Sequence, residues 1–167
     1  MTQKTGLSLI CTLVVSLLLA GQPAWRPATA ARAAQALRAT TLLSADPNWQ
    51  AAGQQPGAEF GTAVAGAGDV DCDGYDDVIV GAPKYENDTT REGAALIYFG
   101  SGGGLHDTPG WLASSGSQGA AFGRAVAPAG DVNGDGCDDV MVGAPNYKYN
   151  DDYQVGAAFV YYGAPEG

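Results

Sequence analysis

The chain repeats itself with a period of 62 residues, and this duplication restricts its possible folds more than any other feature. Of the 27 residues at positions 57–83, 20 are identical to their counterparts at positions 119–145. A tandem repeat of this length indicates one supersecondary unit copied along the chain, each copy burying a face against its neighbour. The duplication therefore predicts two similar units packed side by side.

Each copy contains short apolar runs of strand type separated by turn residues. In the first copy these runs lie at residues 62–65, 77–80 and 94–99, and Gly, Pro, Asn and Asp occupy the gaps. A fourth run at residues 110–113 has an earlier counterpart at residues 48–51. We therefore predict an all-β fold of propeller blades with four antiparallel strands, in which the strand at residues 48–51 helps to close a ring.

The first 30 residues have the layout of a secretory signal peptide. Lys4 precedes an uncharged apolar stretch at residues 7–20, and Ala28 and Ala30 supply the small residues that precede a cleavage site. The stretch is short for a transmembrane helix, although an uncleaved membrane anchor is the alternative. We expect residues 1–30 to be a signal peptide and residues 31–47 a linker. The mature protein is then secreted or held at the cell surface, with no membrane segment of its own.

Acidic residues are concentrated in two nine-residue loops. Residues 69–77 and 131–139 hold 9 of the 18 Asp and Glu residues, in a chain whose formal net charge is −10. This charge argues against a nucleic-acid partner, because such a partner requires a basic surface to displace counterions from phosphates. So many carboxylates in so short a segment repel one another unless a cation lies among them.

The spacing of these carboxylates is that of a calcium loop. Oxygen side chains at loop positions 1, 3 and 5, a glycine at position 6 and a backbone carbonyl at position 7 form a flexible oxygen site, which suits Ca²⁺ better than Mg²⁺ or Zn²⁺. An EF-hand requires a bidentate acid at position 12, where this chain has Val80 and Val142. The loops therefore predict two calcium sites between strands, with a metal-free solvated turn as the alternative.

Each acidic loop is preceded by Phe-Gly and followed by Gly-Ala-Pro, at residues 60–61 and 81–83 and again at 122–123 and 143–145. This arrangement resembles FG-GAP repeats, which form the β-propeller head of integrin alpha chains and occur in many secreted bacterial proteins. The resemblance implies a seven-bladed propeller with calcium in hairpin loops of the blades. The ligands it implies are Asp69, Asp71, Asp73, Tyr75, Asp77, Asp131, Asn133, Asp135, Cys137 and Asp139, with Tyr75 and Cys137 contributing carbonyl oxygens.

The number of repeats departs from the family pattern, since only two units are present where seven are implied. We assign residues 48–114 to a ring-closing strand and the first blade, and residues 115–167 to a second blade that lacks its last strand. We therefore expect a fragment of a longer protein, whose propeller is completed by further blades of that protein or by other copies of this chain.

Binding is the expected function rather than catalysis. The single histidine, His106, lies in a Gly-rich turn that indicates a surface loop, and no nucleophile motif accompanies it. We expect a non-enzymatic, calcium-binding module for adhesion or for recognition of an extracellular protein or glycan. The alternative is the propeller portion of a larger secreted enzyme, such as a phospholipase or another hydrolase. The first candidates for ligand contact are the loop residues Tyr85, Tyr147, Tyr149 and Tyr153.

The remaining cysteines and aromatic residues have structural interpretations. Cys72 and Cys137 occupy different loop positions, four and seven, so the sequence favours unpaired thiols over a disulfide between neighbouring blades, which a secreted protein also permits. Four aromatic residues recur at strand positions and are expected to pack between blades rather than form a sugar-stacking platform: Trp49, Tyr98, Trp111 and Tyr161.

Overall fold

The computed structural model describes residues 43–87, 90–150 and 153–165. The predicted signal peptide and residues 31–42 of the predicted linker lie outside these ranges. From Pro47 onward the chain forms one compact unit. In the described ranges the regular structure consists of strands alone, which confirms the all-β prediction. Within the same ranges there is no helix with the length and apolarity needed to cross a membrane.

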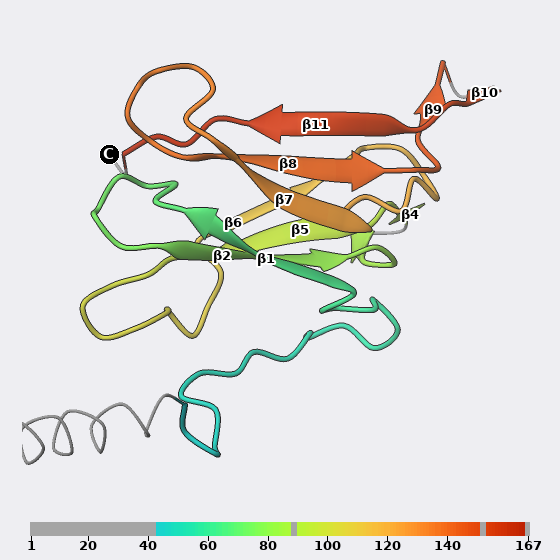
Figure 1. Cartoon of the computed structure of the whole chain (residues 1–167). Coiled ribbons are helices and arrows are strands. Elements are labelled where there is room, and N and C mark those ends of the chain that lie inside the picture. Colours follow the sequence, from blue (N-terminus) through green and yellow to red (C-terminus); the bar gives the residue numbers. More distant parts are fainter. Residues whose placement is uncertain (1–42, 88–89, 151–152, 166–167) are drawn as a thin grey trace, which may run out of the picture. The chain divides into compact units, whose positions relative to one another are not determined.

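The first blade is a sheet of four antiparallel strands (Figure 1). In spatial order these strands are β1 (Ala63–Gly68), β2 (Asp77–Ala82), β5 (Ala94–Tyr98) and β6 (Trp111–Ser114). All five residues of β5 are buried, because both faces of the sheet are covered. This explains why its sequence is a continuous apolar run without polar alternation.

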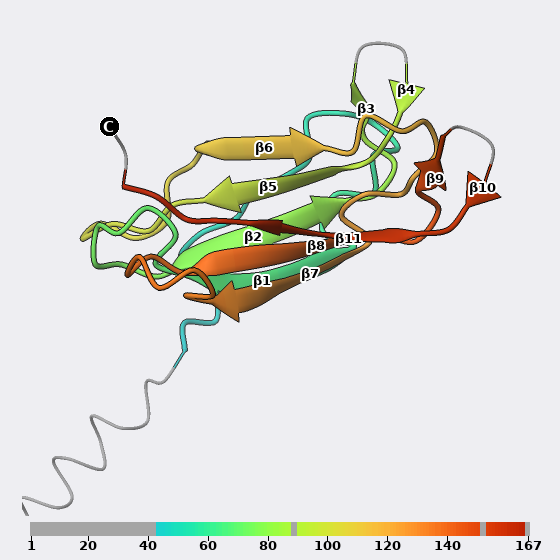
Figure 2. The same ribbon diagram turned by 90° about the horizontal axis from the view of Figure 1, so that it is seen from above.

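The second blade repeats the first three strands of this sheet. It consists of β7 (Ala125–Gly130), β8 (Asp139–Ala144) and β11 (Ala157–Tyr161), with β8 in the middle. Each blade therefore begins with an antiparallel hairpin whose connection is one of the acidic loops. Figure 2 shows the two sheets stacked, with β1 lying against β7.

Two small hairpins that the sequence did not predict extend from the blades. They consist of β3 (Glu86–Asn87) with β4 (Thr90–Arg91), and of β9 (Lys148–Tyr149) with β10 (Tyr153–Gln154). Strands of two residues are too short to show any period of alternation, which is the signal that identifies a strand in sequence.

Aromatic side chains fill the space between the two blades. Phe122 is fully buried and meets Phe159 and Tyr161 edge to face, with ring centroids 5.3 and 6.2 Å apart. Trp111 of β6 reaches across to Tyr161 at 4.9 Å. Edge-to-face packing of this kind stabilises a core beyond simple area burial. The expectation that the repeated aromatic residues pack between blades is confirmed for Trp111 and Tyr161, whereas Trp49 and Tyr98 pack together in a separate apolar cluster on blade 1.

The Phe-Gly and Gly-Ala-Pro motifs meet at this junction, which explains why both contain glycine. A Cβ atom at Gly81 would collide with the carbonyl oxygen of Gly123, and one at Gly123 would collide with the carbonyl oxygen of Ala94. Gly123 also has a φ of 81°, a left-handed conformation that residues with a Cβ adopt at a cost. The two motifs are therefore the places where neighbouring backbones approach most closely.

Residues 48–51 do not form a strand, contrary to the prediction. The outer edge of β5 is already paired with β6, and residues 48–51 pair with no strand among the described residues. Trp49 nevertheless packs on Tyr98 with ring centroids 5.0 Å apart and an interplanar angle of 70°. Its indole N–H donates to the carbonyl of His106 at 3.1 Å. The segment thus has the side-chain packing of a fourth strand without its backbone pairing.

Candidate metal centre

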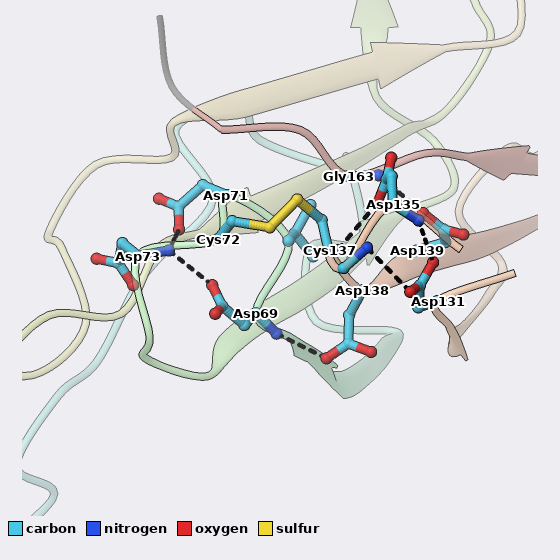
Figure 3. Close-up of a disulfide and its surroundings, with 12 residues drawn as sticks. Asp69, Asp71, Cys72, Asp73, Asp131, Asp135, Cys137, Asp138, Asp139 and Gly163 are labelled. Atoms are coloured by element: carbon cyan, nitrogen blue, oxygen red, sulfur yellow. Dashed lines mark hydrogen bonds between the residues drawn. A yellow bond between two sulfur atoms is a disulfide. The ribbon is translucent and has the colours of Figure 1, made fainter. Parts of the chain in front are cut away.

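The acidic loops lie at the same end of the two blades, where β1 turns into β2 and β7 turns into β8. The ladder of each hairpin shifts register just before its loop, at Gly68 in the first blade and at Gly130 in the second. Figure 3 shows the two loops as neighbours. Loop 1 denotes residues 69–77 and loop 2 denotes residues 131–139 below.

Loop 1 brings three carboxylates together. Asp69, Asp71 and Asp73 each offer an oxygen, and these oxygens lie within 4.8 Å of one another. Backbone N–H groups of the loop orient the side chains: Asp69 accepts from Asp73 at 2.9 Å and from Gly74 at 3.0 Å, and Asp73 accepts from Tyr75 at 2.9 Å. Three convergent carboxylate oxygens are a donor set that fits a hard divalent cation such as Ca²⁺.

The electrostatics of loop 1 favour a positive charge among these groups. Burial raises the pKa of Asp71, and the nearby negative charge of Asp77 raises it further. Burial also raises the pKa of Asp77, while N–H donors from Gly100 and Val70 partly offset that effect. Both shifts report a cost of holding the ionised form, and a bound cation reduces this cost.

Loop 2 has the same turn structure with one charge fewer. Asp131 accepts from the N–H groups of Gly134, Asp135 and Gly136 at 2.6, 3.1 and 3.0 Å. Asn133 replaces an aspartate, and its amide donates to Asp135 at 2.6 Å. The backbone N–H of Cys137, followed by the Asn133 amide, lowers the pKa of Asp135. Loop 2 therefore offers two carboxylates and one amide where loop 1 offers three carboxylates.

The aspartates at loop position 9 are buried backbone clamps. Asp77 is 1% exposed and accepts from the N–H groups of Val70 and Gly100, both at 2.8 Å. Asp139 is 0% exposed and accepts in the same way from Val132 at 2.8 Å and from Gly163 at 2.9 Å. Asp77 lies outside the three-carboxylate cluster. Each carboxylate oxygen retains a further lone pair, so a role as a metal ligand is compatible with the clamp.

Cys72 and Cys137 form a disulfide, so the preference for unpaired thiols was wrong (Figure 3). The Cα atoms are 5.2 Å apart. Neighbouring blades are offset, so that position 4 of loop 1 lies beside position 7 of loop 2. An alignment of the two repeats pairs each position with its own counterpart and therefore cannot reveal such an offset. Cys72 has a φ of 61°, where loop 2 has Gly134 with a φ of 79°. The disulfide is therefore formed from a left-handed position that the duplicated loop gives to glycine.

Asp138 makes a second connection between the loops that sequence reasoning missed. Its carboxylate accepts the N–H of Asp69 at 3.0 Å, and its own N–H donates to the carbonyl of Asp69 at 2.9 Å. A Cβ atom at Gly68 would collide with this carboxylate. No sequence signal indicates that a residue at loop position 8 has a partner in the other blade. Together with the disulfide, Asp138 makes the two loops one structural region.

Two stacked antiparallel sheets, each carrying an acidic loop between its first two strands, define blades of the β-propeller type. A family model for the FG-GAP repeat matches residues 60–98 and 122–161. The chain therefore belongs to the FG-GAP repeat family, with repeats like those of integrin alpha chains. This confirms the resemblance and the fold class predicted from sequence.

Three relatives illustrate this similarity. Integrin alpha-PS3 of Drosophila melanogaster is 40% identical over 95 residues, which are 53% of this chain and 8% of that protein. Integrin alpha-3 of Mus musculus is 42% identical over 95 residues, 56% of this chain and 9% of that protein. Integrin alpha-PS2 of Drosophila melanogaster is 36% identical over 122 residues, 69% of this chain and 8% of that protein. The chain thus spans less than a tenth of each of these relatives.

Proposed function

We propose that this chain is an extracellular, non-enzymatic recognition module in which Ca²⁺ bound by the two acidic loops stiffens the propeller blades. The observation that carries the proposal is the convergence of Asp69, Asp71 and Asp73 to within 4.8 Å. Among the described residues, the ion pairs involve Lys84 with Glu59 and Arg91 with Glu86, and neither pair supplies a cation to this cluster.

Calcium would supply the positive charge that these carboxylates lack. In loop 1 the side chains of Asp69, Asp71, Asp73 and Asp77 and the carbonyl of Tyr75 would hold it. The corresponding groups of loop 2 are the side chains of Asp131, Asn133, Asp135 and Asp139 and the carbonyl of Cys137. Each ion would tie together the two strands that its loop connects, so the expected effect is stability.

The size of this effect follows from ordinary extracellular affinities. Such modules bind Ca²⁺ with dissociation constants of about 10⁻⁴–10⁻³ M. At a tenfold excess of free Ca²⁺ over the dissociation constant, one site stabilises the folded state by about 1.4 kcal/mol. This is sufficient to stiffen a loop that presents a binding surface, while the fold retains its apolar core when calcium is removed.

The recognition surface is proposed to include the β9–β10 hairpin. Of the four loop tyrosines expected to contact ligand, Tyr85 and Tyr147 pack against the two apolar cores. Tyr149 and Tyr153 instead lie opposite each other in the hairpin and are 63% and 73% exposed. Exposed tyrosines provide a large, rigid contact area with a polar end, which suits protein and glycan ligands.

The calcium proposal is tested by thermal unfolding of the purified full chain with Ca²⁺ or with a chelator. The Ca²⁺ concentration is about 10 mM, which is about tenfold above the weaker of the expected dissociation constants. We expect calcium to raise the midpoint by about 5 °C for each occupied site and the double variant Asp73→Asn/Asp135→Asn to lose this response. Asp76→Asn changes an exposed acid of the same loop and should respond like wild type. An unchanged wild-type midpoint would refute calcium binding.

The recognition proposal has its own test on glycan arrays and immobilised extracellular matrix proteins. Replacement of Tyr149 and Tyr153 by serine should remove whatever binding the wild-type chain shows, with no change in the thermal midpoint. Binding that survives the double replacement places the recognition surface elsewhere.

A further inference from the structure

The first candidate ligand of loop 1 has its backbone held by blade 2. The N–H of Asp69 donates to the carboxylate of Asp138 at 3.0 Å, and the carbonyl of Asp69 accepts the N–H of Asp138 at 2.9 Å (Figure 3). The side chain of Asp69 accepts instead from Asp73 and Gly74 within loop 1. Blade 2 therefore fixes the main chain from which this carboxylate projects into the cluster.

The residue after Asp69 is held from blade 2 as well. The carbonyl of Val70 accepts the N–H of Ala164, which follows β11, at 2.9 Å. A Cβ atom at Gly163 would collide with the carbonyl oxygens of Val70 and Asp138, so the chain after β11 fits closely between the two loops. The start of loop 1 is thus bonded to two separate segments of blade 2.

The disulfide holds the middle of loop 1 in a left-handed backbone conformation. Cys72 lies between the candidate ligands Asp71 and Asp73 and has a φ of 61°. Residues other than glycine adopt this conformation at a cost, and the covalent bond to Cys137 of loop 2 restrains it. A different backbone conformation at Cys72 would turn the carboxylates on its two sides away from each other. The disulfide therefore supports the convergence of these two carboxylates.

Support from outside the loop matters because the clustered groups have like charges. The carboxylate oxygens of Asp69, Asp71 and Asp73 lie within 4.8 Å of one another, and without a cation they repel. In a loop free to move they would separate, and a cation would have to bring them together again at a cost in affinity. Groups that orient a metal ligand without touching the metal commonly change metal affinity by about 10–100-fold.

We propose that loop 2 positions the calcium site of loop 1, through Asp138 and through the Cys72–Cys137 disulfide. This dependence, which rests on the calcium binding proposed above, makes the affinity of one blade for Ca²⁺ a property of two blades. Asp138 is a positioning residue, because it acts through the main chain of Asp69 and not as a ligand of that site. Removal of its acceptor oxygen should weaken Ca²⁺ binding to loop 1 about tenfold, and opening the disulfide should do the same.

Titration of the thermal midpoint against Ca²⁺ concentration tests the role of Asp138. The background protein is the full chain with Asp135→Asn, which leaves loop 1 as the intact site. The midpoint begins to rise when free Ca²⁺ reaches the dissociation constant, so Asp138→Ala should move this onset to about tenfold higher Ca²⁺. Asp138→Asn keeps an oxygen that accepts the N–H of Asp69 and should restore the onset. The calcium-free midpoint reports general damage to the fold, which by itself would not move the onset.

Asp76 provides the matched control, because it occupies position 8 of loop 1 as Asp138 does of loop 2, and its side chain is exposed. Asp76→Ala and Asp76→Asn remove the same atoms and charge, and the onset should stay close to that of the background. Equal shifts for Asp138→Ala and Asp138→Asn would assign the effect to charge and overturn the positioning role. An unchanged onset for Asp138→Ala would overturn that role and leave the calcium site standing. A background protein without any calcium response would refute the loop 1 site itself.

The disulfide offers a second measurement that needs no substitution at Asp138. Dithiothreitol breaks the Cys72–Cys137 bond, which gives two protein thiols, and is itself oxidised to its cyclic disulfide. Linkage is reciprocal, so a disulfide that favours Ca²⁺ binding is favoured by Ca²⁺ to the same degree. In the Asp135→Asn background, saturating Ca²⁺ should raise the ratio of oxidised to reduced protein about tenfold at a fixed dithiothreitol ratio, as measured by thiol alkylation. Adding Asp73→Asn should abolish this rise. A ratio that Ca²⁺ does not change in the background protein would overturn the coupling through the disulfide.

Discussion

Phe122 and Phe60 are equivalent residues of the duplication in different surroundings, so replacing each by alanine measures what the contact between blades contributes. Phe122 is 0% exposed and has two aromatic neighbours, Phe159 and Tyr161. Phe60 is half-buried and meets only one aromatic ring among the described contacts, that of Tyr98 at 6.4 Å. The two replacements delete the same atoms and differ only in how much of the ring is buried.

The structure sets the expected magnitudes. Replacement of a fully buried phenylalanine by alanine costs about 3–5 kcal/mol, because both the transfer free energy and the cavity term are lost in full. For Phe60 part of the ring already contacts water, so we expect about half that loss. A domain of this size has a total stability of about 5–15 kcal/mol, and Phe122→Ala therefore removes a large fraction of it.

Equilibrium unfolding in urea, followed by tryptophan fluorescence, measures both values. If Phe122→Ala leaves no folded baseline, Phe122→Leu and Phe60→Leu form a gentler pair with the same expected order. A loss for Phe60→Ala as large as that for Phe122→Ala would refute the reasoning that burial between the blades makes the Phe122 ring the costlier one to remove.

Two further predictions concern the connections between blades. Glu92 is 8% exposed, and the hydroxyl of Thr90, which donates to it at 2.6 Å, lowers its pKa. Its ionised form therefore stabilises the fold above the ordinary glutamate pKa, and this contribution is lost as pH falls through the lowered value. Urea midpoints between pH 7 and pH 3 should fall less steeply for Glu92→Gln than for wild type, and parallel profiles would contradict this. The Cys72–Cys137 disulfide closes a loop with a sequence separation of 65 residues, for which chain entropy predicts about 4 kcal/mol of stabilisation. The double variant Cys72→Ser/Cys137→Ser should accordingly have a lower urea midpoint under non-reducing conditions, and equal midpoints would show that the bridge contributes nothing.

Features within one repeat were predictable from sequence. The β-branched runs that became β2 and β8 are bounded by turn residues on both sides, and the periodic recurrence of Phe-Gly and Gly-Ala-Pro supported each assignment. The acidic loops were also readable, because the turn bonds of Asp69 and Asp131 connect residues within five positions of each other. Local hydrogen bonds of this kind depend on spacing, and spacing is what a sequence displays.

Features that depend on the placement of one blade against another were not predictable. The disulfide between Cys72 and Cys137 and the reach of Asp138 to Asp69 both result from the offset between neighbouring loops. The strand expected at residues 48–51 did not form for a related reason. A strand requires the unpaired edge of a neighbouring strand, and the outer edge of β5 in blade 1 is already paired with β6.

By itself, the sequence determined the repeat, the all-β blades and the spacing of candidate metal ligands in each loop, because these depend on neighbours in the chain. Only the tertiary structure decided that the loops are joined to each other and that Tyr149 and Tyr153 are exposed while Tyr85 and Tyr147 are packed. Those outcomes are set by contacts between residues far apart in the chain, whose geometry arises when the sheets stack.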